Sequence, residues 1–394
     1  MKPTIHVAMI IQGYFPRIGG AERQLAALAP ALRDEGIAIS VLTRRYPGFK
    51  PFELIDGVPV HRLPIPGPVP TAALAFTAAA LPLLRRLEPD VVHAHEMFSP
   101  ATTAVAGKRF LNLPYAVTAH RSGPLGDVER MQNRPFGKRR LRAIRQTAAA
   151  FFVISREIDR ELGGLGIEER RRHYVPNGVD TARFAPVDAA RRSALRAELG
   201  LPADGTITMF AGRLAAEKRV NHLVGVWPQI RAAHPDAILL ILGSGDEEAA
   251  LKAAAGDGVV FGGGVHDVIP YLQAADAFVL PSIAEGFSVA MLEAMATEKA
   301  VVLTDVGGAR DAIDDGANGW LVPPDDPAAL RTALLDVLAD AGERQRRGQA
   351  ARERVVREFS LPVIARNLRG LYEDLARSGP YGRAKIKPVG EDMR

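Results

Sequence analysis

Two glutamates, Glu285 and Glu293, stand eight positions apart around the start of an expected helix. An apolar run at 277–280 predicts a strand, and the loop after it carries Glu285 and Gly286. Gly286 permits close approach of a ligand, and the first N–H groups of the helix would face an anion. Those groups belong to Phe287, Ser288 and Val289. The carboxylates could accept hydrogen bonds from the hydroxyls of a sugar and a ribose.

A simpler interpretation makes Glu293 a surface partner of another residue within the same helix. Its neighbours Met291, Leu292 and Met295 are apolar, so they predict a largely buried helix. An unpaired glutamate would be costly there. The pattern therefore favours a ligand-binding role for Glu293.

Arg213 and Lys218 lie five residues apart in one short connection after another expected strand, at 206–211. A departing diphosphate needs its growing negative charge neutralised, either by a metal ion or by cationic side chains. The chain contains no Asp-x-Asp sequence that would hold a metal, so we expect no metal ion and no cofactor, and assign this role to Arg213 and Lys218. Taken alone, the pair would favour the simpler interpretation of two solvated surface charges, but it stands together with the glutamate motif.

Weaker signals come from a glycine loop and from histidines. Gly19 and Gly20 precede an expected helix and could bring backbone N–H groups to an anion, although a flexible turn fits this segment equally well and Gly-x-Gly-x-x-Gly is absent. His93 and His95 end a strand beside Glu96, which invites a metal-site hypothesis. No third ligand is evident nearby, so structural or substrate-lining roles are favoured over zinc.

Strand-length apolar runs alternate with helix-length segments, which is typical of parallel sheets with crossover helices. The 394 residues predict two domains, each with its own Rossmann-like sheet. We expect one domain over 1–180, a second over 181–360, a helix over 361–378 and a flexible tail over 379–394. The strands of the first half are expected at 5–11, 37–43, 58–63, 91–95, 115–119, 151–155 and 174–176. Those of the second are expected at 206–211, 237–242, 259–261, 277–280, 300–304 and 319–322, with helices at 326–339, 343–358 and 361–377.

The composition is that of an ordinary globular protein, with 47% apolar and 24% charged residues. The chain has no cysteine and shows no export signal, and the apolar stretch 71–84 is too short for a bilayer span and predicts a buried helix. A cytoplasmic location is expected. Residues 1–180 hold 25 Lys and Arg against 16 Asp and Glu, a net charge of +9, so this half could meet nucleic acid, anionic lipid or a phosphorylated substrate.

In their order and spacing, these motifs resemble the large retaining glycosyltransferase family 4, whose fold is GT-B: two Rossmann-like domains with parallel sheets facing an interdomain cleft. The resemblance runs from Gly19-Gly20-Ala21-Glu22 to Asn318-Gly319-Trp320-Leu321-Val322 and includes the turn Asn177-Gly178-Val179-Asp180. It implies that Arg213 and Lys218 bind the donor diphosphate, that Glu285 contacts the donor sugar and that Glu293 contacts the ribose.

Further roles follow only from the resemblance. His120 would lie beside the anomeric centre, and the Gly19-Gly20 loop would close on phosphate and acceptor. Gly243-Ser244 and Gly262 would line the nucleotide pocket, and the last helix would cross back to the N-terminal domain. Two departures are Arg121 and Arg219, which stand where glycine is common. Arg121 leaves the acceptor-side geometry open, and Arg219 is expected only to change a turn.

We therefore expect a metal-independent, retaining transferase that moves a sugar from a UDP- or GDP-sugar to a glycan, lipid-linked or small-molecule acceptor. The alternatives are a nucleotide-sugar epimerase or a sugar phosphorylase on the same fold, or a non-catalytic nucleotide-sugar-binding protein. The sequence demands none of these, and donor hydrolysis or transfer by the purified protein would separate them.

A basic run gives the last expectation. Between Glu129 and Glu157 there is no acidic residue, and the basic ones are Arg130, Arg134, Lys138, Arg139, Arg140, Arg142 and Arg145. From Lys138 the spacing is helical, with Arg139, Arg142 and Arg145 on one face and Leu141, Ile144 and Ala148 on the other. The Arg134–Arg145 region could dock peripherally on an anionic membrane surface, or it could be an ordinary solvated helix. Nucleic acid is not expected, because Phe136 is the only aromatic in the segment.

Overall fold

The computed structural model describes residues 5–15, 19–64 and 69–379. Its contacts divide the chain into two compact units, Met1–Pro176 together with Leu361–Arg394, and Asn177–Ser360. The first division thus falls four residues before the predicted boundary at 180. Pro16, Arg17 and Ile18 of the glycine loop, and the expected tail from residue 380 onward, lie outside the described residues.

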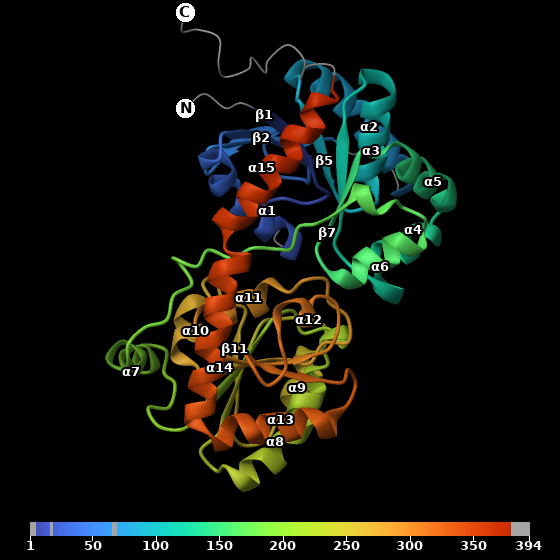
Figure 1. Cartoon of the computed structure of the whole chain (residues 1–394). Coiled ribbons are helices and arrows are strands. Elements are labelled where there is room, and N and C mark those ends of the chain that lie inside the picture. The colour runs from blue at the N-terminus through green and yellow to red at the C-terminus, as the bar shows by residue number, and fades with distance from the viewer. Residues whose placement is uncertain (1–4, 16–18, 65–68, 380–394) are drawn as a thin grey trace, which may run out of the picture. The chain divides into compact units, whose positions relative to one another are not determined.

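The first unit is built on a sheet in the order β3-β4-β2-β1-β5-β6-β7-β8 (Figure 1). Every described pairing in it is parallel except that of β3 with β4. The strands are β1 Ile5–Ile10, β2 Ile37–Arg44, β3 Phe52–Ile55, β4 Val58–Leu63, β5 Val91–His95, β6 Tyr115–Ala119, β7 Ala150–Val153 and β8 Arg172–Tyr174. The central strands β5 and β6 are buried along their whole length, as continuous apolar strands of a covered parallel sheet are.

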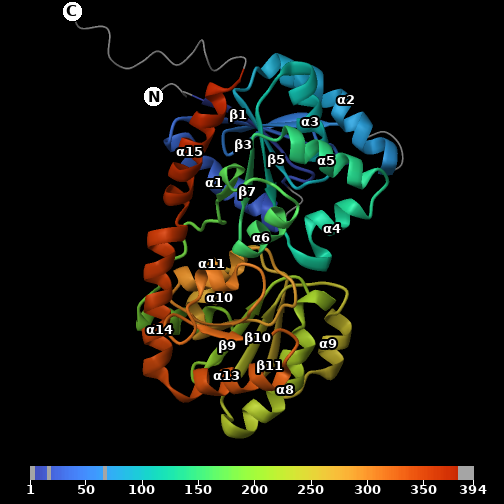
Figure 2. The same cartoon turned by 45° about the vertical axis from the view of Figure 1, so that its right-hand side comes forward.

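Helices cover this sheet and complete its core. They are α1 Gly20–Asp34, α2 Val69–Leu87, α3 Ser99–Leu111, α4 Asp127–Gln132, α5 Gly137–Thr147, α6 Arg156–Gly164 and α15 Leu361–Arg377. Although α15 comes last in the chain, it packs beside α1 and against β1 and β5 (Figures 1 and 2). Leu368 and Tyr372 of α15 join Leu25 and Leu32 of α1 in one buried cluster.

The second unit has a sheet in the order β11-β10-β9-β12-β13-β14, and its described pairings are all parallel. The strands are β9 Ile207–Ala211, β10 Ile238–Leu242, β11 Val259–Gly263, β12 Ala277–Leu280, β13 Ala300–Thr304 and β14 Trp320–Val322. The helices are α7 Ala189–Glu198, α8 Val220–Ala233, α9 Glu248–Ala254, α10 Ile269–Ala274, α11 Val289–Ala296, α12 Ala309–Ala312, α13 Pro327–Ala339 and α14 Ala341–Arg354. Helices α8 and α13 pack side by side (Figure 2).

Three sequence expectations were wrong in detail. Strand β3 was missed because it is short and partly exposed, although the Asp56-Gly57 turn that joins it to β4 has positive φ at both residues and is a hairpin signal. The helix expected at 343–358 ends at Arg354 and continues as a π-helical turn over Val355–Phe359. The helix over the 71–84 stretch is not buried all round, since Leu74 is 70% exposed while Phe76 is buried.

The segment with the basic run folds partly as expected. Helix α5 buries Leu141 and Ile144 and exposes Arg139, Arg142 and Arg145. Three arginines of the predicted cluster also make contacts within the unit: Arg140 donates to the Thr102 hydroxyl, and the guanidinium groups of Arg130 and Arg134 lie 5.1 and 4.3 Å from the centre of the Phe98 ring. In the described part of the chain, no helix is long and apolar enough to cross a membrane.

Candidate functional site

Each unit places its candidate residues where the strand order of the sheet reverses. In the second unit β9 and β12 are neighbours although β10 and β11 lie between them in sequence. In the first unit β1 and β5 are neighbours although β2, β3 and β4 lie between them. In open parallel sheets ligands bind beyond the carboxyl ends of the strands at such a point. The loops after these strands are therefore the places to examine in both units.

In the second unit, the loops after β9 and β12 meet through an ion pair. The Lys218 Nζ atom lies 2.5 Å from Oε1 of Glu285, and each side chain is only 16% exposed. The backbone N–H of Ile283 also donates to the Glu217 carbonyl at 2.9 Å. Lys218, predicted to hold phosphate, and Glu285, predicted to contact the sugar, are thus neighbours although they lie 67 positions apart.

Arg213 has a different environment in the same loop. Its guanidinium pairs with the Glu217 carboxylate, and its side chain is 61% exposed. The following Arg219 has a left-handed backbone with φ of 50°, and its Nε donates to Asp325 at 2.9 Å. Glycine adopts this conformation at the least cost, which accounts for the common glycine at this position in the family that the sequence resembles.

The glycines expected at the nucleotide pocket join the loops after β9, β10 and β11. Gly243 has φ of 138°, and a Cβ there would collide with the Gly212 carbonyl. Its N–H donates to the Gly263 carbonyl at 2.7 Å, and the Ser244 carbonyl accepts from the Leu214 N–H at 2.9 Å. At Gly262 a Cβ would press against the Leu242 side chain. Close backbone packing is therefore one structural reason for glycine at 243 and 262.

Helix α11 begins as the glutamate motif predicts. The Ser288 hydroxyl caps it by accepting the Met291 N–H at 3.3 Å. The Phe287 ring is buried against Phe359, and its carbonyl accepts from the Asn177 side chain at 2.6 Å. Asn177, quoted in the sequence only as part of a turn, thereby fixes this loop.

The expected burial of α11 is also found. Met291, Leu292 and Met295 are buried, while Glu293, within the second turn, is partly exposed. Glu285 and Ser288 line one small hollow between the ends of β12, β13 and the start of α11. Gly286 is buried beneath this loop, and its carbonyl accepts from the Gly308 N–H at 2.6 Å.

In the first unit, His120 follows β6 and its backbone N–H donates to Oδ2 of Asp127 at 2.8 Å. Burial, with Arg121 nearby, lowers the pKa of His120 to about 4, so this imidazole is neutral at pH 7. Its ring stacks on that of His95, with centres 5.6 Å apart and planes inclined by 21°. Gly19 precedes the first residue of α1, Gly20, with an extended backbone.

Sequence reasoning did not single out Asp127, and it noted Glu96 only as a neighbour of His93 and His95. Burial raises the pKa of Asp127 to about 6 and that of Glu96 to about 7, and the carboxylates of Asp127 and Glu22 add to the effect on Glu96. Glu96 also has a positive φ of 75°, a strained conformation that tends to persist at functional sites. The signal in the sequence was the position of Glu96 directly after β5.

The zinc hypothesis for His93 and His95 fails at His93. Its Nδ1 atom is 2.7 Å from the Tyr372 hydroxyl and its Nε2 atom is 2.6 Å from the Thr118 hydroxyl, so both nitrogens are used within the protein. His93 is therefore structural, as the sequence favoured.

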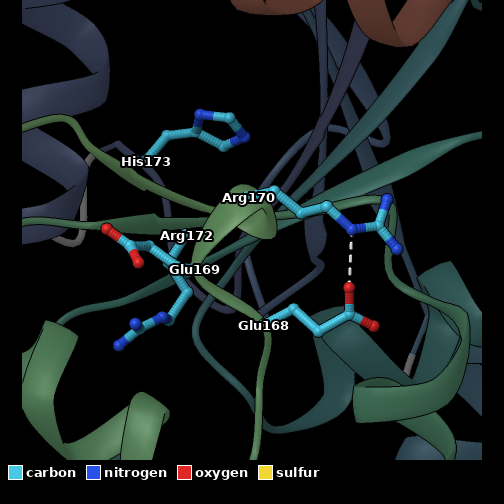
Figure 3. A pocket seen from close by; sticks show the side chains of 5 residues that line it. All are labelled: Glu168, Glu169, Arg170, Arg172 and His173. Carbon is cyan, nitrogen blue, oxygen red and sulfur yellow. Dashed lines mark hydrogen bonds and ion pairs between the residues drawn. The ribbon is translucent and has the colours of Figure 1, made fainter.

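A broad hollow elsewhere in the first unit has no place in this site. It is lined by Glu168, Glu169, Arg170, Arg172 and His173. Figure 3 shows these side chains, with Arg170 paired to Glu168 at 2.6 Å. That pair is largely exposed, and none of the predicted site residues lies among these five.

Two α/β units with parallel sheets, each with polar residues at its switch point, define a protein of the GT-B architecture. Residues 18–183 match the model described as Glycosyltransferase Family 4, and residues 205–340 match Glycosyl transferases group 1. The phosphatidyl-myo-inositol mannosyltransferase of Mycolicibacterium smegmatis is 30% identical over 393 residues, which cover 95% of each chain.

Solved structures agree with this architecture. Sucrose-phosphate synthase from Thermosynechococcus elongatus has a TM-score of 0.80 and 25% identity, covering 94% of this chain and 99% of that one. HepE of Anabaena in complex with UDP-glucose has a TM-score of 0.79 and 19% identity, covering 94% and 100%, and shows the shared fold. The chain belongs to glycosyltransferase family 4 and is a transferase of the GT-B fold.

Proposed function

We propose that this protein is a retaining, metal-independent glycosyltransferase that uses a UDP- or GDP-sugar. The observation that carries the proposal is the Lys218–Glu285 ion pair beyond the ends of β9 and β12, with Arg213 in the same loop. A diphosphate can replace the carboxylates as partner of these cations, which frees Glu285 to accept a hydroxyl of the donor sugar. The family relationship supports the reaction class, and HepE was solved with UDP-glucose.

In the proposed reaction, the bond between the anomeric carbon and the diphosphate oxygen breaks as an acceptor hydroxyl forms a bond on the same face. The acceptor proton passes to the departing phosphate oxygen. Arg213 and Lys218 neutralise the charge that grows on the diphosphate. Glu293 binds the ribose, and the loops with Gly243, Ser244 and Gly262 line the nucleotide pocket. The N–H groups at the start of α11, from Gly286 to Val289, face the phosphates.

In the first unit, His120 orients a hydroxyl near the anomeric carbon. This assignment fits a neutral imidazole, which can donate one hydrogen bond and accept another, and its lowered pKa keeps it neutral. The loop with Gly19 and Gly20 contributes backbone N–H groups to phosphate and acceptor.

A thermal-shift screen of common UDP- and GDP-sugars, followed by transfer assays with each stabilising donor, tests this proposal. A donor at 100 times its dissociation constant adds about 2.7 kcal/mol to the stability of the protein. Stabilisation without hydrolysis or transfer would indicate a binding protein instead, and abolition of activity by EDTA would reveal a metal requirement.

The acceptor is proposed to be a glycan, a lipid-linked sugar or a small molecule, in the cytoplasm or at the inner face of a membrane. The relative from Mycolicibacterium smegmatis is named for a phosphatidyl-myo-inositol acceptor. On α5 the exposed Lys138, Arg139, Arg142 and Arg145 lie beside Phe136, which is 73% exposed. Basic residues with an exposed aromatic ring are suited to the interface of an anionic membrane.

A further inference from the structure

Two histidine rings meet at the carboxyl ends of neighbouring strands in the first unit. His95 is the last residue of β5 and pairs with Thr118 of β6, while His120 directly follows β6. The N–H of Glu96 donates to the Thr118 carbonyl at 2.9 Å, which holds the two strand ends together. The stacked rings of His95 and His120 are consequently fixed by the backbone of the sheet.

His95 is only 8% exposed, yet neither of its ring nitrogens has a hydrogen-bond partner among the residues that the structure describes. The Nε2 atom of His120 and the hydroxyl of the 7%-exposed Ser122 are buried without partners as well. Buried polar atoms in folded proteins are nearly always paired, and each exception calls for a bound water or a ligand. Three such atoms on the two stacked rings therefore indicate a site for a polar molecule.

His93 serves as an internal comparison. It lies on the same side of β5, and its ring centre is 4.2 Å from that of His95. Both of its nitrogens are bonded, to Tyr372 and Thr118. Both ring nitrogens of His93 are thus hydrogen-bonded, whereas those of the adjacent His95 have no partner in the described part of the chain.

The neutral state of these rings favours a neutral ligand. Burial lowers the pKa of His95 well below its usual value, and proximity to His93 and His120 lowers it further, so the ring is uncharged. A neutral imidazole offers one donor and one acceptor, which matches a hydroxyl group. The charges nearby are of both signs, since Asp127 accepts the His120 N–H and Arg121 also acts on His120, so they do not single out an anionic ligand.

We propose that His95, with His120, forms a hydroxyl-binding subsite that takes the neutral polyol part of the acceptor, such as a sugar or cyclitol ring. The inference rests on the proposed function and deepens it, because it names the chemistry of the acceptor at this point. In this subsite His95 is a specificity-determining residue. A phosphate on the acceptor, where there is one, lies elsewhere.

His95→Phe removes both nitrogens but keeps an aromatic ring for the stack. We expect the acceptor KM to rise roughly tenfold, as the loss of a neutral hydrogen bond predicts, with the donor KM and donor thermal stabilisation unchanged. His173→Phe is the matched control, since His173 also packs on an aromatic ring, Phe152, but lies on β8. A native acceptor KM in His95→Phe, or a loss of donor affinity alone, overturns the inference and leaves the transferase assignment intact.

A binding measurement keeps the inference testable if no transfer is found. The ring 15N signals of His95 in the full chain are followed while glucose, mannose, galactose, myo-inositol or inorganic phosphate is added. A shift with at least one neutral polyol, absent with phosphate, supports the subsite. No shift with any of the four, or a shift with phosphate alone, contradicts it whether or not the protein transfers sugar.

Discussion

In the second unit, each proposed phosphate-binding cation has a carboxylate partner, whereas in the first unit the two proposed sugar-side histidines, His95 and His120, are neutral and have ring nitrogens without a partner among the described residues. The difference matches the ligands proposed for each unit. A diphosphate competes with Glu217 and Glu285 for Arg213 and Lys218, so the cations need not stand unpaired in its absence. The buried histidines are neutral because an unpaired buried charge would be costly, and a neutral imidazole can still donate one hydrogen bond to a hydroxyl and accept another.

The largest expected effect comes from removing the proposed phosphate-binding cations of the second unit. Lys218→Ala and Arg213→Ala should each lower kcat about a hundred- to thousandfold, or ~2.7–4 kcal/mol, since each removes a donor that acts in the transition state. Steady-state kinetics and circular dichroism would separate this from unfolding. Lys252→Ala is the control, because Lys252 is an exposed cation of the same unit that also pairs with a glutamate, Glu248. Full activity in either site variant would remove these cations from the mechanism.

A lipid-binding experiment tests whether the exposed basic residues on α5 of the first unit bind an anionic membrane surface. Lys138, Arg139, Arg142 and Arg145 changed together to Ser should lower binding to vesicles containing anionic lipid about a hundred- to thousandfold, since each basic residue near such a surface contributes about 1 kcal/mol. Co-sedimentation at rising salt measures this. Ser at four exposed basic positions of the second unit, Arg183, Arg191, Lys252 and Arg357, is the control. Equal binding to neutral and anionic vesicles would favour a soluble acceptor.

The two glutamates of the second unit are expected to affect different kinetic constants. Glu285→Gln keeps the volume but removes the charge facing Lys218 at 2.5 Å, so turnover should fall roughly ten- to hundredfold. Glu293→Gln should act mainly by raising the donor KM. Separate measurement of kcat and KM distinguishes the two.

The stereochemistry of the product decides the mechanism in the same experiments. NMR should show that the new linkage keeps the anomeric configuration of the donor. An inverted linkage would contradict the same-face route and make His120 a candidate general base.

The smallest effect concerns the buried carboxyls of the first unit. Burial raises the pKa of Glu96 to about 7, so the folded protein binds more protons than the unfolded chain between pH 4.5 and 7. The free energy of unfolding therefore falls as pH rises through this window, because the buried Glu96 carboxyl loses its proton. Glu96→Gln should raise Tm by roughly 2–4 °C at pH 8 and by little at pH 5. Glu198→Gln, an exposed change in the second unit, should not alter the pH dependence.

Sequence reasoning succeeded where local pattern fixes structure. The alternation of apolar runs and helical segments predicted the parallel sheets, and Glu285-Gly286 before an apolar helix predicted the start of α11. It failed where tertiary contacts reassign a side chain. Arg134, just before the basic helix, and Arg140, on it, look like surface cations, but Phe98 and Thr102 on neighbouring segments contact them.

The sequence by itself determined the order of the elements, the family and the identity of the residues at the strand ends, because each depends on periodicity or on short motifs. Only the tertiary structure decided which strand ends are neighbours. Lys218 meets Glu285 across 67 residues because β9 lies beside β12, and Tyr372 reaches His93 across 279 residues because α15 packs on β5. His95 joins His120 for the same reason, since β5 and β6 are adjacent. Strand order is set by the packing of the whole sheet, and no local pattern specifies it.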